Sequence, residues 1–382
     1  MDKIPPVELT QQYRSLADEL LPAVEALISS GHYIGGPVVT ALETSLAQFV
    51  GCTEVVACNS GTDALYLAMR ALNIGPGDEV IVPPFTFFSS AEAISMTGAR
   101  PVFVDIEAET FNIDCDRIEA AITPRTKAIM PVHLFGRPVN MTAVMDIATR
   151  HQLAVVEDCA QATGASWDGR KVGAIGHVGC FSFFPTKNLG GMGDGGAVST
   201  SDPAIAATVR MLKEHGSKER YYHEALGVNS RLDALQAAIL NVKLPHLSEW
   251  NECRRNLAAT YQFLLADCPD IVLPQNGVGG QSVWNQFTIR IQSGHQSSGE
   301  RRDRVKQALF EAGVISMIYY PVPIHLQKAY AKLSHQPGDF PVAELCASEV
   351  LSLPMFPELS YVQQERVARA LYAALSPSAA VA

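Results

Sequence analysis

The sequence predicts an α/β fold, in which a large domain with a mainly parallel sheet, sandwiched by helices, precedes a smaller α+β domain. Strand-like and helix-like segments alternate through the first two thirds of the chain. The strand-like segments are apolar at successive positions, which is typical of parallel strands covered on both faces. The length of 382 residues also exceeds what one simple core needs, which favours two domains.

The first four predicted strands of the large domain are each followed by a predicted helix. In chain order these pairs fall at residues 55–58 and 62–72, 79–82 and 89–97, 101–104 and 114–122, and 128–132 and 141–151. Two further strands are predicted at residues 154–157 and 180–184. Ligands of such sheets bind outside the carboxyl ends of the strands, so functional side chains are expected there.

The pattern changes near residue 244. A long amphipathic helix is predicted at 244–265, followed by a strand at 282–291, a helix at 301–312, a Pro-rich strand end at 319–323 and a last helix at 361–375. We therefore predict a large domain with an N-terminal arm at residues 1–245 and a small C-terminal domain at residues 246–382.

Composition is that of an ordinary soluble protein, with 47% hydrophobic and 18% charged residues. No apolar stretch approaches the ~20 residues of a membrane span. The start lacks the basic flank and apolar core of a signal peptide. The eight cysteines form no CxxC pair, which favours reduced thiols. We expect a cytoplasmic protein without a membrane partner.

The net charge of −10 argues against a nucleic-acid partner, because nucleic-acid binders normally carry a basic face. Scattered histidines such as His133 and His151 show no metal-ligand spacing, so no metal site is expected. An anionic substrate would need cations placed locally, since the overall field of the protein is negative.

Lys187 and Asp158 are the leading catalytic candidates. Lys187 follows an aromatic, strand-like run and precedes a run of glycines, and desolvation at such a place frees the amine as a nucleophile. Asp158 ends another apolar strand. A lysine that attaches covalently and an acid that holds the ring-nitrogen proton are the two groups that pyridoxal phosphate (PLP) requires. A surface lysine beside a glycine loop is the alternative interpretation.

A phosphate site is predicted at the turn after residue 58. Strand, Asn-Ser-Gly turn and helix start follow one another there, so free N–H groups and the helix dipole suit a phosphate dianion. Gly61 allows close approach to the main chain, and Thr62 adds a hydroxyl. An ordinary helix cap without a ligand is the alternative.

Three further side chains are placed to complete a PLP site. Phe87 could stack on the pyridine ring, although Phe85 and Phe88 could equally be core. Gln161 would reach the ring oxygen, and the hydroxyl of Ser182 could join the phosphate cup. The glycines at 190–196 follow no strand directly and lack the later acidic residue, which excludes a dinucleotide loop.

Five motifs occur in an order that resembles the DegT/DnrJ/EryC1/StrS sugar aminotransferases. They are Gly61-Thr-Asp-Ala-Leu, Glu157-Asp-Cys-Ala-Gln, Ser182-Phe-Phe-Pro-Thr-Lys-Asn, Gly227-Val-Asn-Ser-Arg-Leu-Asp-Ala-Leu-Gln-Ala-Ala and Tyr320-Pro-Val-Pro-Ile-His. The likeness covers nearly the full chain. It implies a fold-type-I aminotransferase, a homodimer, and active sites shared between subunits.

Position by position, the resemblance gives Lys187 the covalent link to PLP and Asp158 the ring nitrogen. It implies that Phe87 stacks on the ring, that Gln161 lies on the ring-hydroxyl side, and that the phosphate is bound by Gly61, Thr62, Ser182 and, from the partner subunit, Asn229. A branch of the family with histidine at the lysine position performs dehydration, so Lys187 indicates a transaminase. Asp194 replaces the glutamate that the family often has, which is a mild departure.

The implied reaction moves an amino group from an amino acid, expected to be L-glutamate, to a nucleotide-linked keto sugar for amino-sugar or polysaccharide biosynthesis. The stretch 215–231 resembles the branch acting on UDP-linked 3-keto-2-acetamido-glucuronate. Arg231 is then the candidate for the sugar carboxylate, with a structural ion pair as its alternative, and Tyr319, Tyr320 and His325 are further substrate-binding candidates. Tyr319 stands where some members have histidine.

Two other functions stay open. One is an aminotransferase for a dTDP- or UDP-linked 3- or 4-keto-6-deoxy sugar, because the Tyr-Tyr-Pro-Val-Pro-Ile-His run also occurs in such enzymes. The other is a non-catalytic, PLP-binding regulatory protein, against which the complete set of catalytic groups and the lack of a DNA-binding module argue.

Overall fold

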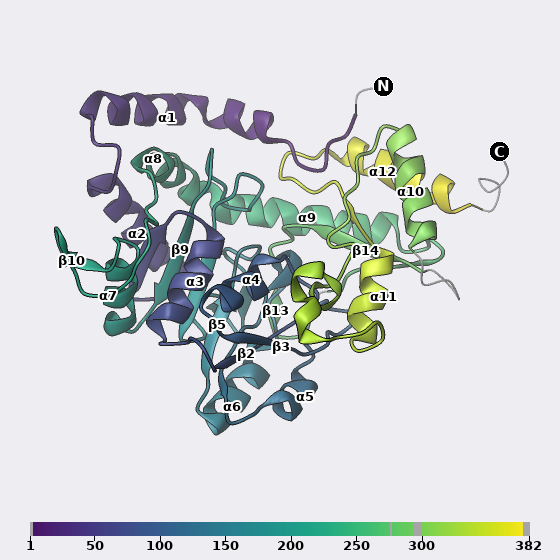
Figure 1. Ribbon diagram of the computed structural model, residues 1–382. Coiled ribbons are helices and arrows are strands. Elements are labelled where there is room, and N and C mark those ends of the chain that lie inside the picture. Colours follow the sequence, from purple (N-terminus) through teal and green to yellow (C-terminus); the bar gives the residue numbers. More distant parts are fainter. Residues whose placement is uncertain (1–2, 276, 293–298, 377–382) are drawn as a thin grey trace.

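A seven-stranded sheet forms the centre of the computed structural model, which describes residues 3–275, 277–292 and 299–376 (Figure 1). Its strand order is β1-β9-β8-β5-β4-β2-β3. The strands are β1 (Glu54–Cys58), β2 (Glu79–Val82), β3 (Arg100–Phe103), β4 (Thr126–Ile129), β5 (Ala154–Asp158), β8 (Val178–Ser182) and β9 (Gly196–Thr200). Strand β9 is antiparallel to both neighbours, and the other strands share one direction. The predicted mainly parallel sheet is therefore confirmed.

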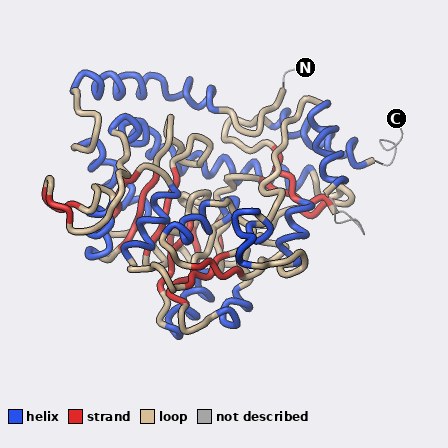
Figure 2. Tube along the Cα trace, viewed as in Figure 1, coloured by secondary structure: helices blue, strands red, loops and turns tan. Residues whose placement is uncertain are grey.

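Helices cover both faces of this sheet, as the tube in Figure 2 also shows. The side chains of Val56 and Cys58 join a core with α3 (Gly61–Ala71), α4 (Ser89–Met96) and α7 (Pro203–Leu212). Those of Val55 and Ala57 join the opposite core, with α2 (Pro37–Val50), α6 (Met141–His151) and α8 (Ala234–Lys243). Alternate residues of one strand thus face two cores, which explains why these strands are apolar at successive positions.

The N-terminal arm is a helix, α1 (Leu9–Ser30), which the sequence analysis did not predict. It lies along the top of the molecule in Figure 1, beside α8. Only three of its side chains are buried: Leu16, Leu20 and Leu27. Large apolar side chains such as Leu21 and Ile28 remain exposed on it. The apolar spacing is interrupted by Pro22, which obscures the helical pattern in the sequence.

The C-terminal part builds a core of its own. It contains α9 (Leu247–Leu264), a sheet of β12 (Ile271–Val272), β14 (Phe287–Ile291) and β15 (Val350–Leu353), and the helices α10 (Glu300–Glu311), α11 (Pro341–Glu349) and α12 (Tyr361–Leu375). Leu257 of α9 belongs to this C-terminal core, and so does Ile4 from the start of the chain. Leu247, also in α9, packs in the core of the large domain. Helix α9 therefore contributes to both cores, and the predicted boundary at 245/246 falls just before it.

Some predicted elements differ from the structure. The Pro-rich segment 319–323 is a loop, and only Met317 before it pairs with β15, because proline cannot donate to a ladder. Strand β14 begins five residues later than predicted, after Trp284 adopts a left-handed φ of 47°. The helix predicted at 114–122 is shorter, as α5 (Cys115–Ile118) followed by a 3-10 turn (Glu119–Ala121).

The remaining strands are short. They are β6 (Ser166–Trp167), β7 (Arg170–Lys171) and β13 (Gly280–Gln281), which form one small sheet, and β10 (Ser217–Glu219) with β11 (Tyr222–His223), which form a hairpin at the edge of the molecule (Figure 1). Among the residues that the structure describes, no helix combines the length and the apolar character needed to cross a membrane.

Candidate active site

A cavity of about 420 Å³ lies at the carboxyl edge of the central sheet. The segments that follow β1, β2, β5 and β8 all contribute to its wall, as expected for parallel strands that end at the same edge. Its lining includes most of the predicted site residues: Gly61, Thr62, Phe87, Asp158, Gln161, Ser182, Lys187, Tyr319 and Tyr320. Residues spread over 260 positions of sequence therefore meet in one place.

Asp158 ends β5 and is buried at the floor of this cavity. One carboxylate oxygen, Oδ2, accepts a hydrogen bond of 2.8 Å from Ser90 Oγ, and Oδ1 accepts one of 3.1 Å from the backbone N–H of Ala160. Burial raises the pKa of Asp158, while the bond from Ser90 and the charge of Lys187 act in the opposite direction. These partners favour the ionised form, which is the form that can hold a proton on a ring nitrogen.

Lys187 stands in the loop after β8, and its backbone N–H bonds the carbonyl of Phe184. Desolvation lowers the pKa of its amine to about 8, and the negative charge of Asp158 raises it in part. A substantial share of the amine is therefore neutral near physiological pH, as a nucleophile and proton acceptor requires.

The loop that carries Lys187 is held in place by buried amides. The Asn188 side chain donates to Asn251 Oδ1 at 2.7 Å and accepts from Asn285 Nδ2 at 2.8 Å. All three side chains are buried, so each bond is shielded from water. Lys187 thus projects from a segment tied to α9 and to the residues just before β14.

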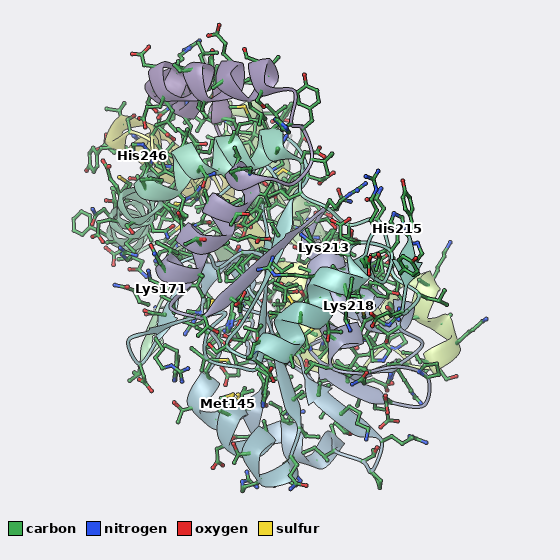
Figure 3. All side chains as sticks on the ribbon, turned by 90° about the vertical axis from the view of Figure 1, so that its left-hand side faces the viewer. Met145, Lys171, Lys213, His215, Lys218 and His246 are labelled. Carbon is green, nitrogen blue, oxygen red and sulfur yellow. The ribbon has the colours of Figure 1, made fainter. Side chains whose placement is uncertain are left out.

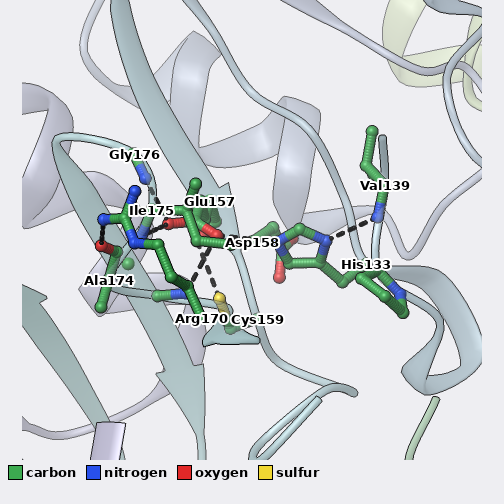
Figure 4. A network of polar contacts seen from close by, with 12 residues as sticks. His133, Val139, Glu157, Asp158, Cys159, Arg170, Ala174, Ile175 and Gly176 are labelled. Atoms are coloured by element: carbon green, nitrogen blue, oxygen red, sulfur yellow. Dashed lines mark hydrogen bonds and ion pairs between the residues drawn. The ribbon is translucent and has the colours of Figure 1, made fainter. Parts of the chain in front are cut away.

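A second buried network lies beside Asp158, on the other side of the β5 backbone (Figure 4). Glu157 accepts hydrogen bonds from the backbone N–H groups of Gly173, Ile175 and Gly176 and lies 3.1 Å from His133 Nε2. The other ring nitrogen of His133 accepts from Val139 N, so Nε2 carries the proton and donates it. His133, Glu157 and Cys159 lie close together, but this bonding gives the first two a structural role at the end of β5.

The turn between β1 and α3 is shaped for an anion. Ser60 caps α3 and accepts from Asp63 N, which leaves the first N–H groups of the helix directed outward. A Cβ at Gly61 would lie 2.7 Å from Cβ of Ser182, so only glycine fits there. The Thr62 hydroxyl is 2.8 Å from Ser89 Oγ. Gly61, Thr62 and Ser182 form one cup, as the sequence predicts.

The aromatic side chains divide as the sequence analysis allowed. Phe87 lines the cavity and is 56% exposed, whereas Phe85 is buried in the core. Exposure leaves a face of the Phe87 ring open to a ligand. Gln161 uses both ends of its amide, since Oε1 accepts from Phe135 N at 2.6 Å and Nε2 donates to the Tyr320 hydroxyl at 3.1 Å.

Three predicted residues do not line the cavity of their own chain. Asn229 is exposed and pairs through its backbone with Glu214, and Arg231 Nη1 lies 3.6 Å from Glu214 Oε2. His325 is buried, stacks edge-on against Phe340 and pairs with Glu344 at 3.1 Å. The predicted contact of His325 with the sugar has no support in this arrangement, because packing within the C-terminal part encloses its ring.

Sequence reasoning missed several residues of the site. Ser90, the second residue of α4, carries a hydroxyl whose position next to Asp158 no local pattern signals. Gln286 and Thr186 also line the cavity, and Gln286 Oε1 is buried without a hydrogen-bond partner in the described part of the chain. Gln286 precedes β14 in an ordinary strand context, so only the three-dimensional arrangement reveals it.

The residues present fit PLP. A Cβ at Gly61 would crowd Ser182 in the cup, so glycine keeps the backbone there open to an anion. Lys187 and Asp158 line the same cavity and carry the amine and the carboxylate that the cofactor requires. Phe87 lines the same cavity and is partly exposed, so its ring is open to a ligand. The sequence motifs and the residues that line the cavity therefore both indicate PLP as the ligand.

Known relatives match nearly the whole chain. The model of the DegT/DnrJ/EryC1/StrS aminotransferase family matches residues 14–372. A UDP-N-acetyl-3-dehydro-alpha-D-glucosamine 3-aminotransferase of Acidithiobacillus ferrooxidans is 49% identical over 96% of each chain. A dTDP-3-amino-3,4,6-trideoxy-alpha-D-glucose transaminase of Streptomyces venezuelae is 45% identical, over 96% of this chain and 94% of its own length.

A third relative, a UDP-2-acetamido-2-deoxy-3-oxo-D-glucuronate aminotransferase of Pseudomonas aeruginosa, is 41% identical over 96% of this chain and 98% of its own length. The solved structure of S. venezuelae DesV in complex with a ketimine intermediate superposes with a TM-score of 0.94, at 44% identity, over 98% of this chain and all of that one. This chain therefore belongs to the DegT/DnrJ/EryC1/StrS family of PLP-dependent aminotransferases.

Proposed function

We propose that this nucleotide-sugar aminotransferase uses a UDP-linked 2-acetamido-3-keto sugar as amino acceptor and L-glutamate as amino donor. Amination of a nucleotide-linked sugar is the activity that the named relatives share. The observation that carries the chemistry is the meeting of Lys187 and Asp158 across one cavity.

The chemistry of transfer divides between cofactor and protein. PLP, when bound, supplies the electron sink. The Asp158 carboxylate, oriented by Ser90, holds the proton on the ring nitrogen. Neutral Lys187 Nζ takes the proton from the amino-bearing carbon of the donor, and in the second half of the reaction it delivers a proton to the former keto carbon of the sugar. The cup at Gly61 and Thr62 fixes the phosphate end.

Identity to the relatives favours a 2-acetamido-3-keto sugar on UDP, since the A. ferrooxidans enzyme named for such a sugar is 49% identical. Gln286 supports a polar acceptor, because its buried Oε1 lacks a hydrogen-bond partner in the described chain and lines the cavity. A sugar hydroxyl or an acetamido N–H would satisfy it.

The glucuronate form of this sugar is the second candidate. Arg231 favours it, as a guanidinium suited to a carboxylate. Glu214 competes for the same guanidinium at 3.6 Å, and the glucuronate-specific relative is the less similar of the two UDP-sugar enzymes, at 41% identity. We therefore propose the sugar without a carboxylate as the amino acceptor, ahead of the glucuronate.

A second copy of the chain would complete the site. Tyr33 and Ile34 are 54% and 52% exposed beside Asp233, and Met192 is 48% exposed beside Gln236. Such a neighbouring group of exposed apolar side chains marks an interaction surface. Asn229 and Arg231 do not line the cavity of their own chain, and Asn229 is exposed. Both observations support a homodimer in which these two residues serve the partner's site.

The hairpin of β10 and β11 is a candidate binding site for the nucleotide part of the substrate. Tyr221 and Tyr222 are exposed on it, and Lys218 pairs with Glu224 at 2.7 Å. Figure 3 shows His215 and Lys218 on the side of the molecule that it turns toward the viewer. Exposed tyrosines can stack on a base, and basic side chains can meet a diphosphate.

Separate half-reactions test this function. Purified protein loaded with PLP should lose the absorbance of the lysine-linked cofactor when glutamate is added and regain it with the correct keto sugar. The acceptor panel is UDP-2-acetamido-3-keto-glucose, its glucuronate counterpart, and dTDP-linked 3- and 4-keto-6-deoxy sugars. Preference for either dTDP sugar would contradict the assignment, and persistence of the absorbance with every donor would indicate a regulatory protein.

A further inference from the structure

Ser230 lies between the two residues predicted to reach the partner subunit, yet its own side chain points inward. It is 0% exposed, whereas Asn229 before it is exposed. Its Oγ donates a hydrogen bond of 2.7 Å to Asp63 Oδ2 and accepts one of 3.2 Å from the backbone N–H of Asn59. None of the proposed site contacts uses this hydroxyl.

Both partners of Ser230 border the anion cup. Asn59 immediately precedes Ser60, and Asp63 immediately follows Thr62. Asp63 N in turn donates to Ser60 Oγ at 3.1 Å, which closes the first turn of α3. The buried Ser230 hydroxyl therefore contacts Asn59 before and Asp63 after the turn whose N–H groups would face the phosphate.

The neighbours of Ser230 belong to a strip of two antiparallel segments. Ser230 N donates to Lys213 O at 3.0 Å, Asn229 forms a bridge with Glu214, and Arg231 contacts the Glu214 carboxylate. Lys213 Nζ also donates to Ala57 O at 2.7 Å, at the end of β1. The strip is thus attached to the same strand end from which the anion cup begins.

We propose that Ser230 is a positioning residue that couples the phosphate cup of its own subunit to the Asn229–Arg231 strip that serves the partner's site. Phosphate held at one site would order Asn59 and Asp63, and through the Ser230 hydroxyl the strip at the other site. The inference rests on the proposed shared dimer, and it adds a physical connection between its two sites.

The first test measures cofactor affinity without turnover. Apo protein carrying Ser230→Ala is titrated with PLP and compared with Ser199→Ala. Ser199 is a matched control, because its hydroxyl is equally buried and bonds carbonyl groups away from the cup. Loss of a hydrogen bond to a charged group should raise the PLP dissociation constant about tenfold or more in Ser230→Ala. Equal constants for the two variants would overturn the proposal.

The second test uses mixed dimers with one working site. One subunit carries Lys187→Ala, and Ser230→Ala is placed either in the working subunit or in the Lys187→Ala subunit. The first placement should weaken PLP binding at the working site. The second should raise the KM for the keto sugar measured at saturating PLP, because that subunit supplies Asn229 and Arg231 to the working site. An unchanged KM in the second placement would confine Ser230 to its own cup and overturn the coupling.

Failure of the dimer assumption is distinguishable from failure of the coupling. Mixed dimers of Lys187→Ala with Arg231→Ala report whether sites are shared at all, independently of Ser230. If Ser230→Ala prevents dimerisation, the coupling is tested without a variant, by hydrogen exchange of the unmodified apo protein with and without PLP. Added PLP should then slow exchange in residues 213–214 and 229–231, and exchange that PLP does not alter would contradict the proposal.

Discussion

Asp158 and Lys187 lie in a cavity walled by their own chain, whereas most residues of the segment 214–231 are partly or fully open to solvent. At the floor, Asp158 has Ser90 and Ala160 as partners, and the loop after Lys187 is tied by buried asparagines. The 214–231 segment carries exposed Tyr221, Tyr222 and Leu226, at 79%, 68% and 88%.

This difference separates chemistry from recognition. Buried groups that hydrogen-bond to one another hold a lysine and an acid at fixed positions with shifted pKa values, which the common chemistry of transamination requires. Exposed apolar and basic side chains are suited to a surface that becomes covered by a partner chain or a ligand. Substitutions at the floor should therefore change rates for every substrate, and substitutions in the segment should change which sugar is accepted.

The largest effect is expected from Lys187→Ala. Turnover with glutamate and any keto sugar should fall by about 10³-fold or more, because the amine proposed to move the proton is lost. The fold should persist, since the change removes chemistry and little packing. Lys243→Met is the control, because burial also lowers the pKa of Lys243 to about 8 but its amine bonds Gly190 O. Borohydride fixation of PLP at Lys243 instead of Lys187 would contradict the assignment.

Asp158→Asn should slow the glutamate half-reaction by about 10²-fold or more, since an amide cannot hold the ring proton by charge. Asp194 is the matched comparison, as a second carboxylate that lines the same cavity. Stopped-flow measurement of both variants discriminates the two acids. A greater loss for Asp194→Asn would mean that the wrong carboxylate has been chosen.

Ser90→Ala should have a smaller effect, about tenfold on the same half-reaction, because one hydrogen bond to a charged group is lost. The pKa of Asp158 should also rise, since this bond lowers it. Ser95→Ala on the same helix serves as control, because its hydroxyl bonds Ala91 O and lies by Tyr330 instead of Asp158. Equal rates in the two variants would remove Ser90 from the site.

The pH dependence of PLP attachment tests the lowered pKa of Lys187 in the unmodified protein, without loss of activity. The neutral amine attacks, so the rate of attachment to apo protein should rise with pH and level off above about 8, the lowered pKa of Lys187. An ordinary lysine would show a rise that continues toward about 10.5. In Asp158→Asn the inflection should move to lower pH, because Asp158 raises the pKa of Lys187. A shift to higher pH would contradict the charge interaction.

The sheet and the floor could be predicted from sequence because their signals are local. Apolar strands end directly at Asp158 and shortly before Lys187, and a Gly-containing turn opens α3. Parallel order then brings these ends to one edge. Even the two helix-covered faces follow from strands that are apolar at successive positions.

Other parts depend on contacts between distant residues. Ser90 is 68 positions from Asp158, and Ser230 is 167 positions from Asp63, so no spacing rule connects them. His325 carries the expected motif, but its ring packs against Phe340, which a motif cannot reveal. Helix α1 was missed because a proline interrupts its pattern and few of its side chains are buried in the single chain.

The most direct test asks whether Arg231 of one subunit serves the active site that contains Lys187 of the other subunit. A Lys187→Ala subunit is coexpressed with an Arg231→Ala subunit, and mixed dimers are isolated with two affinity tags. In a shared dimer, the Arg231→Ala subunit keeps its lysine and receives an intact arginine, so one of two sites should work. Activity near half that of the unmodified dimer is the predicted result. Activity no higher than that of either parent variant would contradict the shared site.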